Sequence, residues 1–285
     1  MKVAVIGAGE MGRWLADFSK CLGEVTVSDI SAAKASRVAS ELRIASKPAK
    51  EAIQRADIVL IAVPISKTPG VLKSAAKIAR KGALLADVAS VKSDAVNAMR
   101  GIKVDIELVS MHPLFGPGAS SLKNKDIVVV PIRPGKLYKE LKSALAKKGA
   151  RITEMDADTH DRVMAIVQCM SHFVLLAYMH SMKSVSGLKQ AGMLRTPIFS
   201  NLMNLAKASM TGNPDLYGEL QVQNKYAKVV RSSMMESFHS LDAAFSKGDT
   251  KAVRNIFKGA LAQFGQREVK RLYERLYKQF EDGSS

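Results

Sequence analysis

The chain has 285 residues, of which 47% are hydrophobic, enough to bury two cores, and this argues against a largely disordered protein. Its formal net charge is +17, but Lys and Arg are spread along the chain and there is a single Trp to stack on bases. We therefore expect a solvated basic surface and no nucleic-acid partner. The alternative is a nucleic-acid-binding face. Cys21 and Cys169 match no metal-ligand spacing. We therefore expect two buried thiols, no metal and a cytoplasmic protein.

No apolar run in the sequence approaches the roughly 20 residues of a membrane span, and the apolar start is too short for a signal peptide. We expect no membrane partner.

The N-terminal residues are typical of a dinucleotide-binding turn. An apolar, largely β-branched run at 2–6 leads into Gly7-Ala8-Gly9-Glu10-Met11-Gly12, and helical periodicity follows from Arg13 to Leu22. The first glycine permits a tight turn, the second lets the backbone approach a pyrophosphate, and the third lets the helix pack on the strand. We predict cofactor contacts from Gly7, Gly9, Glu10, Met11 and Gly12.

A second strand, residues 24–28, ends in Asp29. A carboxylate at this place can accept hydrogen bonds from the adenosine ribose and would repel a 2′-phosphate, which favours NAD. Lys34 and Arg37 lie just beyond and could pair with a 2′-phosphate, so NADP is the alternative.

The pattern then alternates between strands and helices, as in a parallel sheet. Two apolar runs, Asp57–Val63 and Ala83–Val88, predict strands buried on both faces, with a helix at Thr68–Arg80 between them. Val63 and Pro64, where the first run ends, are predicted to contact the cofactor. Further strands are expected at 106–109, 126–132 and 151–155, and a helix at 136–148.

Three polar residues follow strands of this sheet. Ser90 and Lys92 come after the strand at 83–88, and ligands in open α/β sheets bind beyond the carboxyl ends of strands. His112 precedes a proline, so its backbone is extended and its imidazole has a set direction. We predict that Ser90 and Lys92 reach the nicotinamide and substrate, the alternative for Ser90 being a helix cap.

Beyond Met155 no strand pattern survives, and we place the domain boundary there: a dinucleotide-binding domain at 1–155 and an all-helical domain at 156–285. A helix from Thr159, apolar on nearly all sides and carrying His172, is expected to be buried at the centre of the second domain. Two long helices are expected, one from Asn213 to about Phe245 and one from Gly248 to Phe280, forming a core or a subunit interface.

Several of these motifs together resemble the prephenate dehydrogenase family of tyrosine biosynthesis. They are the glycine motif at 7–12, Asp-Val-Ala-Ser-Val-Lys at 87–92, Met-His-Pro-Leu-Phe-Gly-Pro at 111–117, His-Asp at 160–161 with Ser-His-Phe at 171–173, and Asn-Pro-Asp-Leu-Tyr at 213–217. The resemblance implies a Rossmann-type domain, a helical domain, a homodimer, and NAD(P)-dependent oxidation of prephenate to 4-hydroxyphenylpyruvate with loss of carbon dioxide. We expect no chorismate mutase segment before residue 1 and no regulatory domain after the last helix.

By this resemblance His112 takes the catalytic position, Ser90 orients it and the substrate, Lys92 lies close by, and His172 contacts substrate, the alternative for His172 being a packing residue. The arginine that family members use on a substrate carboxylate falls at Ala208 here, so Lys207 or Arg195 is predicted to replace it. Arogenate is the alternative substrate. A non-catalytic Rossmann-type binding module, suggested by the charge and the missing arginine, is the alternative from another class.

Overall fold

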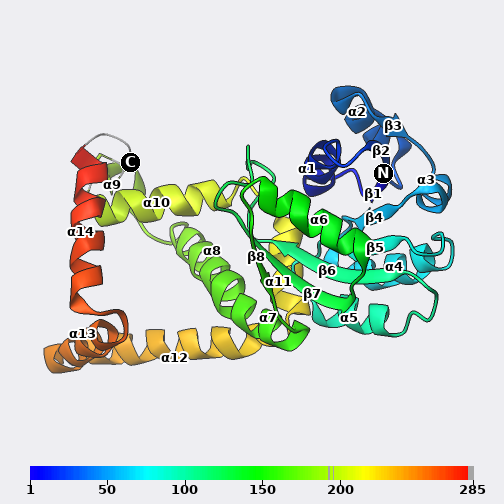
Figure 1. The fold of residues 1–285 in the computed structure, drawn as a ribbon. Coiled ribbons are helices and arrows are strands. Elements are labelled where there is room, and N and C mark those ends of the chain that lie inside the picture. The colour runs from blue at the N-terminus through cyan, green and yellow to red at the C-terminus, as the bar shows by residue number, and fades with distance from the viewer. Residues whose placement is uncertain (192, 195, 282–285) are drawn as a thin grey trace. The chain divides into compact units, whose positions relative to one another are not determined.

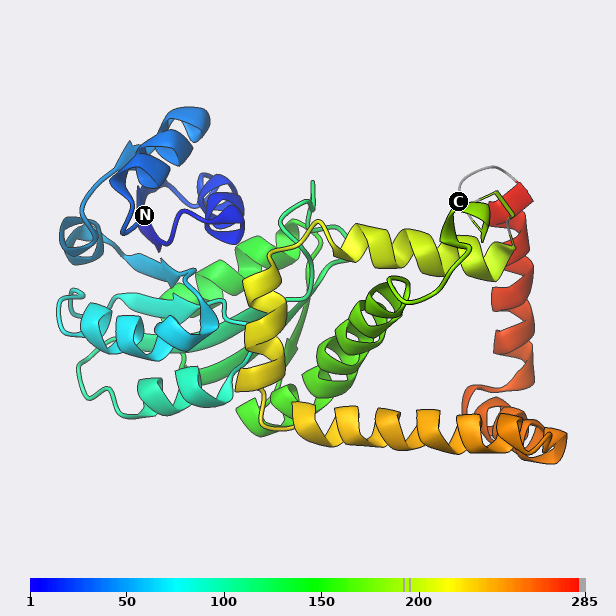
Figure 2. The same cartoon turned by 180° about the vertical axis from the view of Figure 1, so that it is seen from behind.

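The computed structural model describes residues 1–191, 193–194 and 196–281 (Figures 1 and 2). The chain divides into two compact units. The first comprises Met1–Met164 and Val222–Lys225, and the second comprises Ala165–Gln221 and Tyr226–Ser285. The first unit is a sheet covered by helices and the second is helical, which confirms the predicted fold class.

An eight-stranded sheet in the order β3-β2-β1-β4-β5-β6-β7-β8 forms the first unit. All neighbouring strands are parallel except β6 and β7, which are antiparallel. The strand order reverses between β1 and β4, and this is the switch point at which open α/β sheets bind dinucleotides. The strands are β1 (Lys2–Ile6), β2 (Glu24–Ser28), β3 (Ala45–Ser46), β4 (Ile58–Ile61), β5 (Leu84–Asp87), β6 (Glu107–Pro113), β7 (Asp126–Arg133) and β8 (Arg151–Glu154).

The helices of the first unit are α1 (Glu10–Ser19), α2 (Ala32–Leu42), α3 (Ala49–Arg55), the 3₁₀ turn η1 (Ile65–Lys67), α4 (Thr68–Ala76), α5 (Ser93–Arg100), α6 (Lys136–Lys147) and α7 (Ala157–Met164). Helix α1 begins at Glu10, inside the glycine motif, and not at Arg13 as expected.

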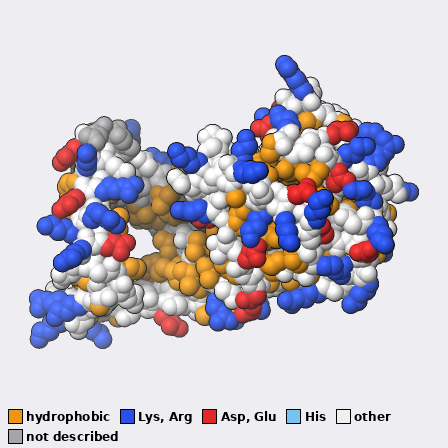
Figure 3. All heavy atoms as spheres, in the orientation of Figure 1, with side chains coloured by type: hydrophobic (Ala, Val, Ile, Leu, Met, Phe, Trp, Pro, Cys, Tyr) orange, Lys and Arg blue, Asp and Glu red, His pale blue; other side chains and the backbone are white. Residues whose placement is uncertain are grey.

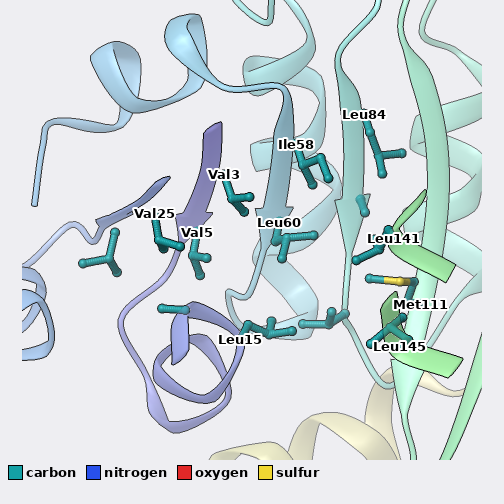
Figure 4. Close-up of a cluster of buried hydrophobic side chains, with 14 of the residues drawn as sticks. Val3, Val5, Leu15, Val25, Ile58, Leu60, Leu84, Met111, Leu141 and Leu145 are labelled. Atoms are coloured by element: carbon teal, nitrogen blue, oxygen red, sulfur yellow. The ribbon is translucent and has the colours of Figure 1, made fainter. Parts of the chain in front are cut away.

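The central strands are apolar on both faces because helices cover the sheet on both sides. Val3 and Val5 of β1 point into one core with α1, α2 and α6, while Ala4 and Ile6 point into the other with α3, α4 and α5. Figure 4 shows the first core, where Leu15 of α1 lies beside Val5 and Leu60, while Leu141 and Leu145 of α6 lie beside Met111. The period-two alternation of a strand thus puts every second residue of a continuous apolar run on each face.

Strand β6 extends four residues beyond its predicted end at Val109 and includes His112. The antiparallel neighbour β7 supplies the reason, because it pairs Met111 with Val129 and His112 with Val128. On the other side Asp87 of β5 pairs with Ser110, so His112 projects past the end of β5. His112 is therefore held by a strand and not by a loop.

The second unit contains the π-helix η2 (Ala165–Met170), α8 (Ser171–Ser181), α9 (Leu188–Ala191), α10 (Pro197–Ser209), most of α11 (Pro214–Gln223), α12 (Ala227–Ser246), α13 (Thr250–Phe264) and α14 (Gln266–Glu281). The long helices predicted at 213–245 and 248–280 are each broken. The first breaks at 224–226, where Asn224 is buried and donates from Nδ2 to the backbone oxygen of Asp161 at 2.7 Å. The second breaks at Gly265, whose φ of 79° is outside the helical region.

The helix carrying His172 is not buried as expected. In α8 Leu175 is the buried residue, and Leu176 is 43% exposed. Helices α13 and α14 have no buried residue. Hydrophobic side chains lie at the surface over α8 and α10 in Figure 3. Among the described residues of the chain, these helices therefore have apolar faces that are not covered.

Two further expectations are corrected. Cys21 is exposed, because it follows the end of α1 at the surface, while Cys169 is buried. The run Ala157–Ser181 is 25 residues long and, by length and composition alone, apolar enough to cross a membrane, contrary to the prediction that no such run exists. The core helices of soluble proteins pass the same test.

Candidate functional site

The glycine loop after β1 has the geometry of a phosphate cradle. Gly7 has a φ of 111°, and a Cβ there would lie 2.1 Å from the backbone oxygen of Ala62, while a Cβ on Gly12 would lie 1.8 Å from the oxygen of Gly7. A Cβ on Gly9 would meet nothing within 4 Å. Two glycines thus allow the turn to close against the sheet and against itself, and Gly9 leaves open space beside the N-terminus of α1.

Asp29 is joined to this loop. Its Oδ2 accepts a hydrogen bond from the Ala8 amide at 2.7 Å, and its Oδ1 accepts one from the Ser31 amide at 2.8 Å. Each carboxylate oxygen has a second lone pair with which to accept a hydrogen bond from a hydroxyl group. The residue is half-buried at the end of β2, next to the glycine loop.

Four other predicted cofactor residues lie around the same edge of the sheet. Glu10 is exposed and Met11 half-buried in the first turn of α1; Val63 is half-buried and Pro64 exposed just beyond β4.

Lys92 is fully buried and does not reach solvent. Its ammonium group donates to Asp87 Oδ1 at 2.9 Å, to Ser110 Oγ at 2.8 Å and to the backbone oxygen of Met111 at 2.6 Å. Burial lowers the pKa of Lys92, against the nearby Asp87 carboxylate, which raises it. Residues of β5 and β6 thus accept hydrogen bonds from all three N–H groups. The prediction that Lys92 reaches the nicotinamide and substrate is therefore corrected: its side chain holds the ends of these two strands together.

His112 is 2% exposed, and its Nδ1 lies 2.9 Å from Nε2 of His160. The rings meet edge to face, with centroids 5.1 Å apart. The Nδ1 of His160 is in turn 2.8 Å from Oδ1 of Asp161. Two histidines and a carboxylate thus form a buried chain that runs from β6 to α7.

The pKa values of both histidines are lowered. Burial is the largest cause for His112, followed by the charges of His160 and Lys92, and its pKa lies well below the ordinary value of 6.5. Burial also lowers the pKa of His160, against the hydrogen bond to Asp161, which raises it. Both imidazoles are therefore neutral at pH 7 and can accept a proton.

Ser90 is half-buried in the loop between β5 and α5. It does not cap the helix, because α5 begins three residues later and Lys92 is its N-cap. Its hydroxyl makes no hydrogen bond to any residue that the structure describes. The Ser90 hydroxyl is thus available to a ligand at the carboxyl end of the sheet, where His112 lies near the end of β6.

The other predicted substrate residues belong to the second unit. His172 of α8 is half-buried, its ring centroid is 4.4 Å from that of Tyr217, and burial lowers its pKa. Its Nδ1 is buried without a hydrogen-bond partner among the described residues. Lys207 and Ala208 are exposed on α10, and Arg195 lies outside the described residues.

Sequence reasoning assigned no role to His160, Asp161, Asp87 or Ser110, which surround His112 and Lys92. The sequence did contain one signal for these contacts, the adjacent residues His160 and Asp161. Ionisable side chains that are buried usually have a polar partner, and each of these two could serve as the partner of the other. What could not be read from the sequence is that α7 returns to the end of β6.

Comparisons with known proteins agree with this architecture. Residues 16–154 match the family model "Prephenate dehydrogenase, nucleotide-binding domain", and residues 156–259 match "Prephenate dehydrogenase, dimerization domain". The glycine motif precedes the first matched range.

The chain is 30% identical over 287 residues to the 4-amino-4-deoxyprephenate dehydrogenase of Streptomyces pristinaespiralis, covering 96% of the chain and 95% of the relative. It is 28% identical over 279 residues to the probable arogenate/prephenate dehydrogenase of Methanocaldococcus jannaschii, covering 95% of the chain but 62% of that longer protein.

Among solved structures, the prephenate dehydrogenase of Aquifex aeolicus in complex with hydroxyphenyl propionate and NAD⁺ has the same fold. The TM-score is 0.73 at 18% sequence identity, and the match covers 92% of this chain and 97% of the other. With two family models matched in order along the chain and a relative of nearly the same length, the chain belongs to the prephenate dehydrogenase family.

Proposed function

We propose that this protein is an NAD-dependent dehydrogenase that oxidises prephenate to 4-hydroxyphenylpyruvate, with loss of carbon dioxide, in tyrosine biosynthesis. One observation carries the proposal: the His112 imidazole is buried at the end of β6, at the carboxyl end of a sheet whose first strand leads into a dinucleotide-type glycine turn. Burial lowers the pKa of His112, which favours the neutral form. The cofactor belongs to the domain at 1–155 and the substrate and dimer contacts to the domain at 156–285.

The residues of the first unit fit a dinucleotide. The open space at Gly9 and the amides of the first turn of α1 suit a pyrophosphate, and the Asp29 carboxylate suits ribose hydroxyls. When bound, NAD supplies the acceptor for the hydride. Asp29 favours NAD over NADP because a carboxylate repels a 2′-phosphate, and Lys34 and Arg37 are the residues on which NADP use would depend.

The role of His112 follows from the charge that develops in the reaction. As hydride leaves the carbon that bears the ring hydroxyl, that hydroxyl becomes more acidic, and His112 accepts its proton. The carbon–oxygen bond becomes a carbonyl, and the bond to the ring carboxylate then breaks as carbon dioxide leaves. Its electron pair makes the ring aromatic and moves to the carbonyl oxygen, which takes the proton back from His112 to give the phenol of the product. General base catalysis of this kind contributes about 10² to 10⁴-fold. Ser90 is proposed to orient His112 and the hydroxyl.

Prephenate is a dianion, and its carboxylates require cations. Since Ala208 stands where family members carry an arginine, we propose Lys207, its neighbour on α10, as the substitute, with Arg195 as the other candidate and His172 as a further substrate contact. A lysine is a point charge without the fork of a guanidinium, so carboxylate recognition here is less directional.

A second candidate substrate is a cyclohexadiene with one amino group. The relative of nearly equal length is a 4-amino-4-deoxyprephenate dehydrogenase, and the Methanocaldococcus relative is named for both arogenate and prephenate. The missing arginine also favours a changed substrate.

We further propose that the protein is a homodimer through its helical half. The second family match is to a dimerization domain, and α13 and α14 have no buried residue in a single chain. A second copy would cover the exposed apolar faces, including that of the run from Ala157 to Ser181.

The experiment is an initial-rate assay with prephenate, arogenate and 4-amino-4-deoxyprephenate, each against NAD and NADP. We expect the highest kcat/KM with prephenate and NAD. His112→Asn is expected to lose about 10² to 10⁴-fold in kcat while it keeps NAD binding and its melting temperature. Full activity of that variant would remove His112 from the reaction, and no reduction of either cofactor by the wild type with any of the three substrates would refute the proposed function.

A further inference from the structure

We propose that His160 is a positioning residue that holds His112 in the tautomer with its proton on Nδ1, so that Nε2 is the atom that takes the substrate proton. The inference rests on the proposed function for its catalytic meaning, but the tautomer itself is a property of the chain alone. In this role His160 does not contact substrate and acts through His112.

The carboxylate of Asp161 is held by several hydrogen bonds. Its Oδ1 accepts from the Lys92 amide at 2.8 Å, and its Oδ2 accepts from the Ser93 amide at 2.9 Å and from the Ser93 hydroxyl at 2.5 Å. Burial raises the pKa of Asp161, but the hydrogen bonds from His160, Ser93 and Lys92 outweigh it and leave the pKa below its ordinary value. Asp161 is therefore ionised and can only accept.

An ionised carboxylate 2.8 Å from Nδ1 of His160 requires that this nitrogen carry a proton. His160 is neutral at pH 7, because burial lowers its pKa. A neutral imidazole has one proton, so Nε2 of His160 has a lone pair and accepts.

The acceptor at Nε2 of His160 lies 2.9 Å from Nδ1 of His112, and the proton between them belongs to His112. Neutral His112 then has its lone pair on Nε2. Asp161 thus sets the tautomer of His160, and His160 sets that of His112, across two hydrogen bonds. The other charged groups at this place are Lys92 and Asp87, which are paired with each other at 2.9 Å.

Two substitutions separate the two bonds that His160 makes. In His160→Asn the amide nitrogen can occupy the place of Nδ1 and keep the bond to Asp161, but no acceptor remains for His112. In His160→Gln the amide oxygen can occupy the place of Nε2 and accept from His112. A role in packing alone would predict that the two variants behave alike.

We expect kcat to fall about 10²-fold in His160→Asn, with KM for substrate and NAD binding near wild type, and to fall less than about 10-fold in His160→Gln. The acid limb of the kcat profile should also shift in His160→Asn and be kept in His160→Gln. His239→Asn, an exposed histidine of α12, is the matched control and should leave kcat and the profile unchanged.

The tautomer is read directly from ¹⁵N-histidine-labelled wild-type protein by ¹H–¹⁵N correlation at pH 8, with the His112 signals assigned by their loss in His112→Asn. The Nδ1–H tautomer is expected. An Nε2–H tautomer in the wild type, or equal kcat values for the two His160 variants, would overturn the inference. Because the spectrum needs no substrate and uses the wild type, it decides the tautomer even if His160→Asn fails to fold or none of the three substrates is oxidised.

Discussion

At the scale of single residues, the first unit contains a buried ion pair between Lys92 and Asp87. Lys92 has no exposed surface, and its partner Asp87 is equally buried, with Oδ2 of Asp87 unpaired among the described residues. The sequence identified Lys92 from its place after a strand, but a position does not reveal the direction of a side chain. The flanking strand β6 supplies two of the three acceptors, and this turns the side chain into the protein.

Lys92→Met is expected to lower the free energy of unfolding by about 3–5 kcal/mol, because removal of one partner leaves a buried carboxylate without its counter-ion. Denaturant unfolding followed by circular dichroism measures the change. Asp87→Asn added to Lys92→Met should restore part of the loss, since an uncharged amide costs less to bury than an unpaired carboxylate.

Lys142→Met is the matched control for this prediction. Lys142 pairs with Glu154 at the surface, its side chain is 43% exposed, and such ion pairs contribute little. Equal destabilisation by Lys92→Met and Lys142→Met would show that the buried pair contributes no more than a surface pair.

At the scale of elements, most strands of the first unit were predicted closely and the long C-terminal helices were not. The runs at 2–6, 24–28 and 126–132 became strands with bounds that agree within a residue or two. Period-two and continuous apolar patterns are local properties of a chain. The break at 224–226 has no such local cause, because it depends on a bond from Asn224 to the backbone of Asp161, 63 residues away.

The glycine loop allows a test in which the same substitution has two different outcomes. Gly9→Ala should fold with a melting temperature near wild type, because its φ of −71° suits alanine and a Cβ there meets nothing within 4 Å. It should weaken NAD binding at least about 10-fold, since the methyl group fills the space that a pyrophosphate needs.

Gly7→Ala should instead destabilise the fold by more than about 1 kcal/mol, because its φ is 111° and a Cβ would collide with the Ala62 backbone. Isothermal titration with NAD and thermal unfolding of both variants make the comparison. Unchanged NAD affinity in Gly9→Ala would mean that the loop does not hold the cofactor's phosphates.

At the scale of the whole molecule, the described helices of the second unit expose apolar side chains. Phe257 of α13 is 67% exposed and Leu272 of α14 is 50% exposed, although isolated helices are marginal in water and depend on the packing of their apolar faces. The sequence pattern indicated buried helices because hydrophobic periodicity records which faces avoid water, not which chain covers them.

Sedimentation of the wild type is expected to give about twice the chain mass of 30.8 kDa. Phe257→Glu should shift the protein towards monomer, because a carboxylate in an apolar interface is costly to desolvate. Val104 is an apolar residue of the first unit that is 43% exposed, and Val104→Glu should leave the mass unchanged. A wild type that sediments as a monomer at micromolar concentration would contradict the proposed dimer.

The sequence by itself determined the fold class, the glycine turn with Asp29, and the choice of His112, because these depend on local periodicity and on short motifs. Only the tertiary structure decided that Lys92 faces inward, that His160 and Asp161 lie against His112, and that the helix predicted from Asn213 breaks at 224–226. Each of these depends on a contact between segments far apart in the chain, and neither periodicity nor spacing encodes which distant side chain will fill a given place.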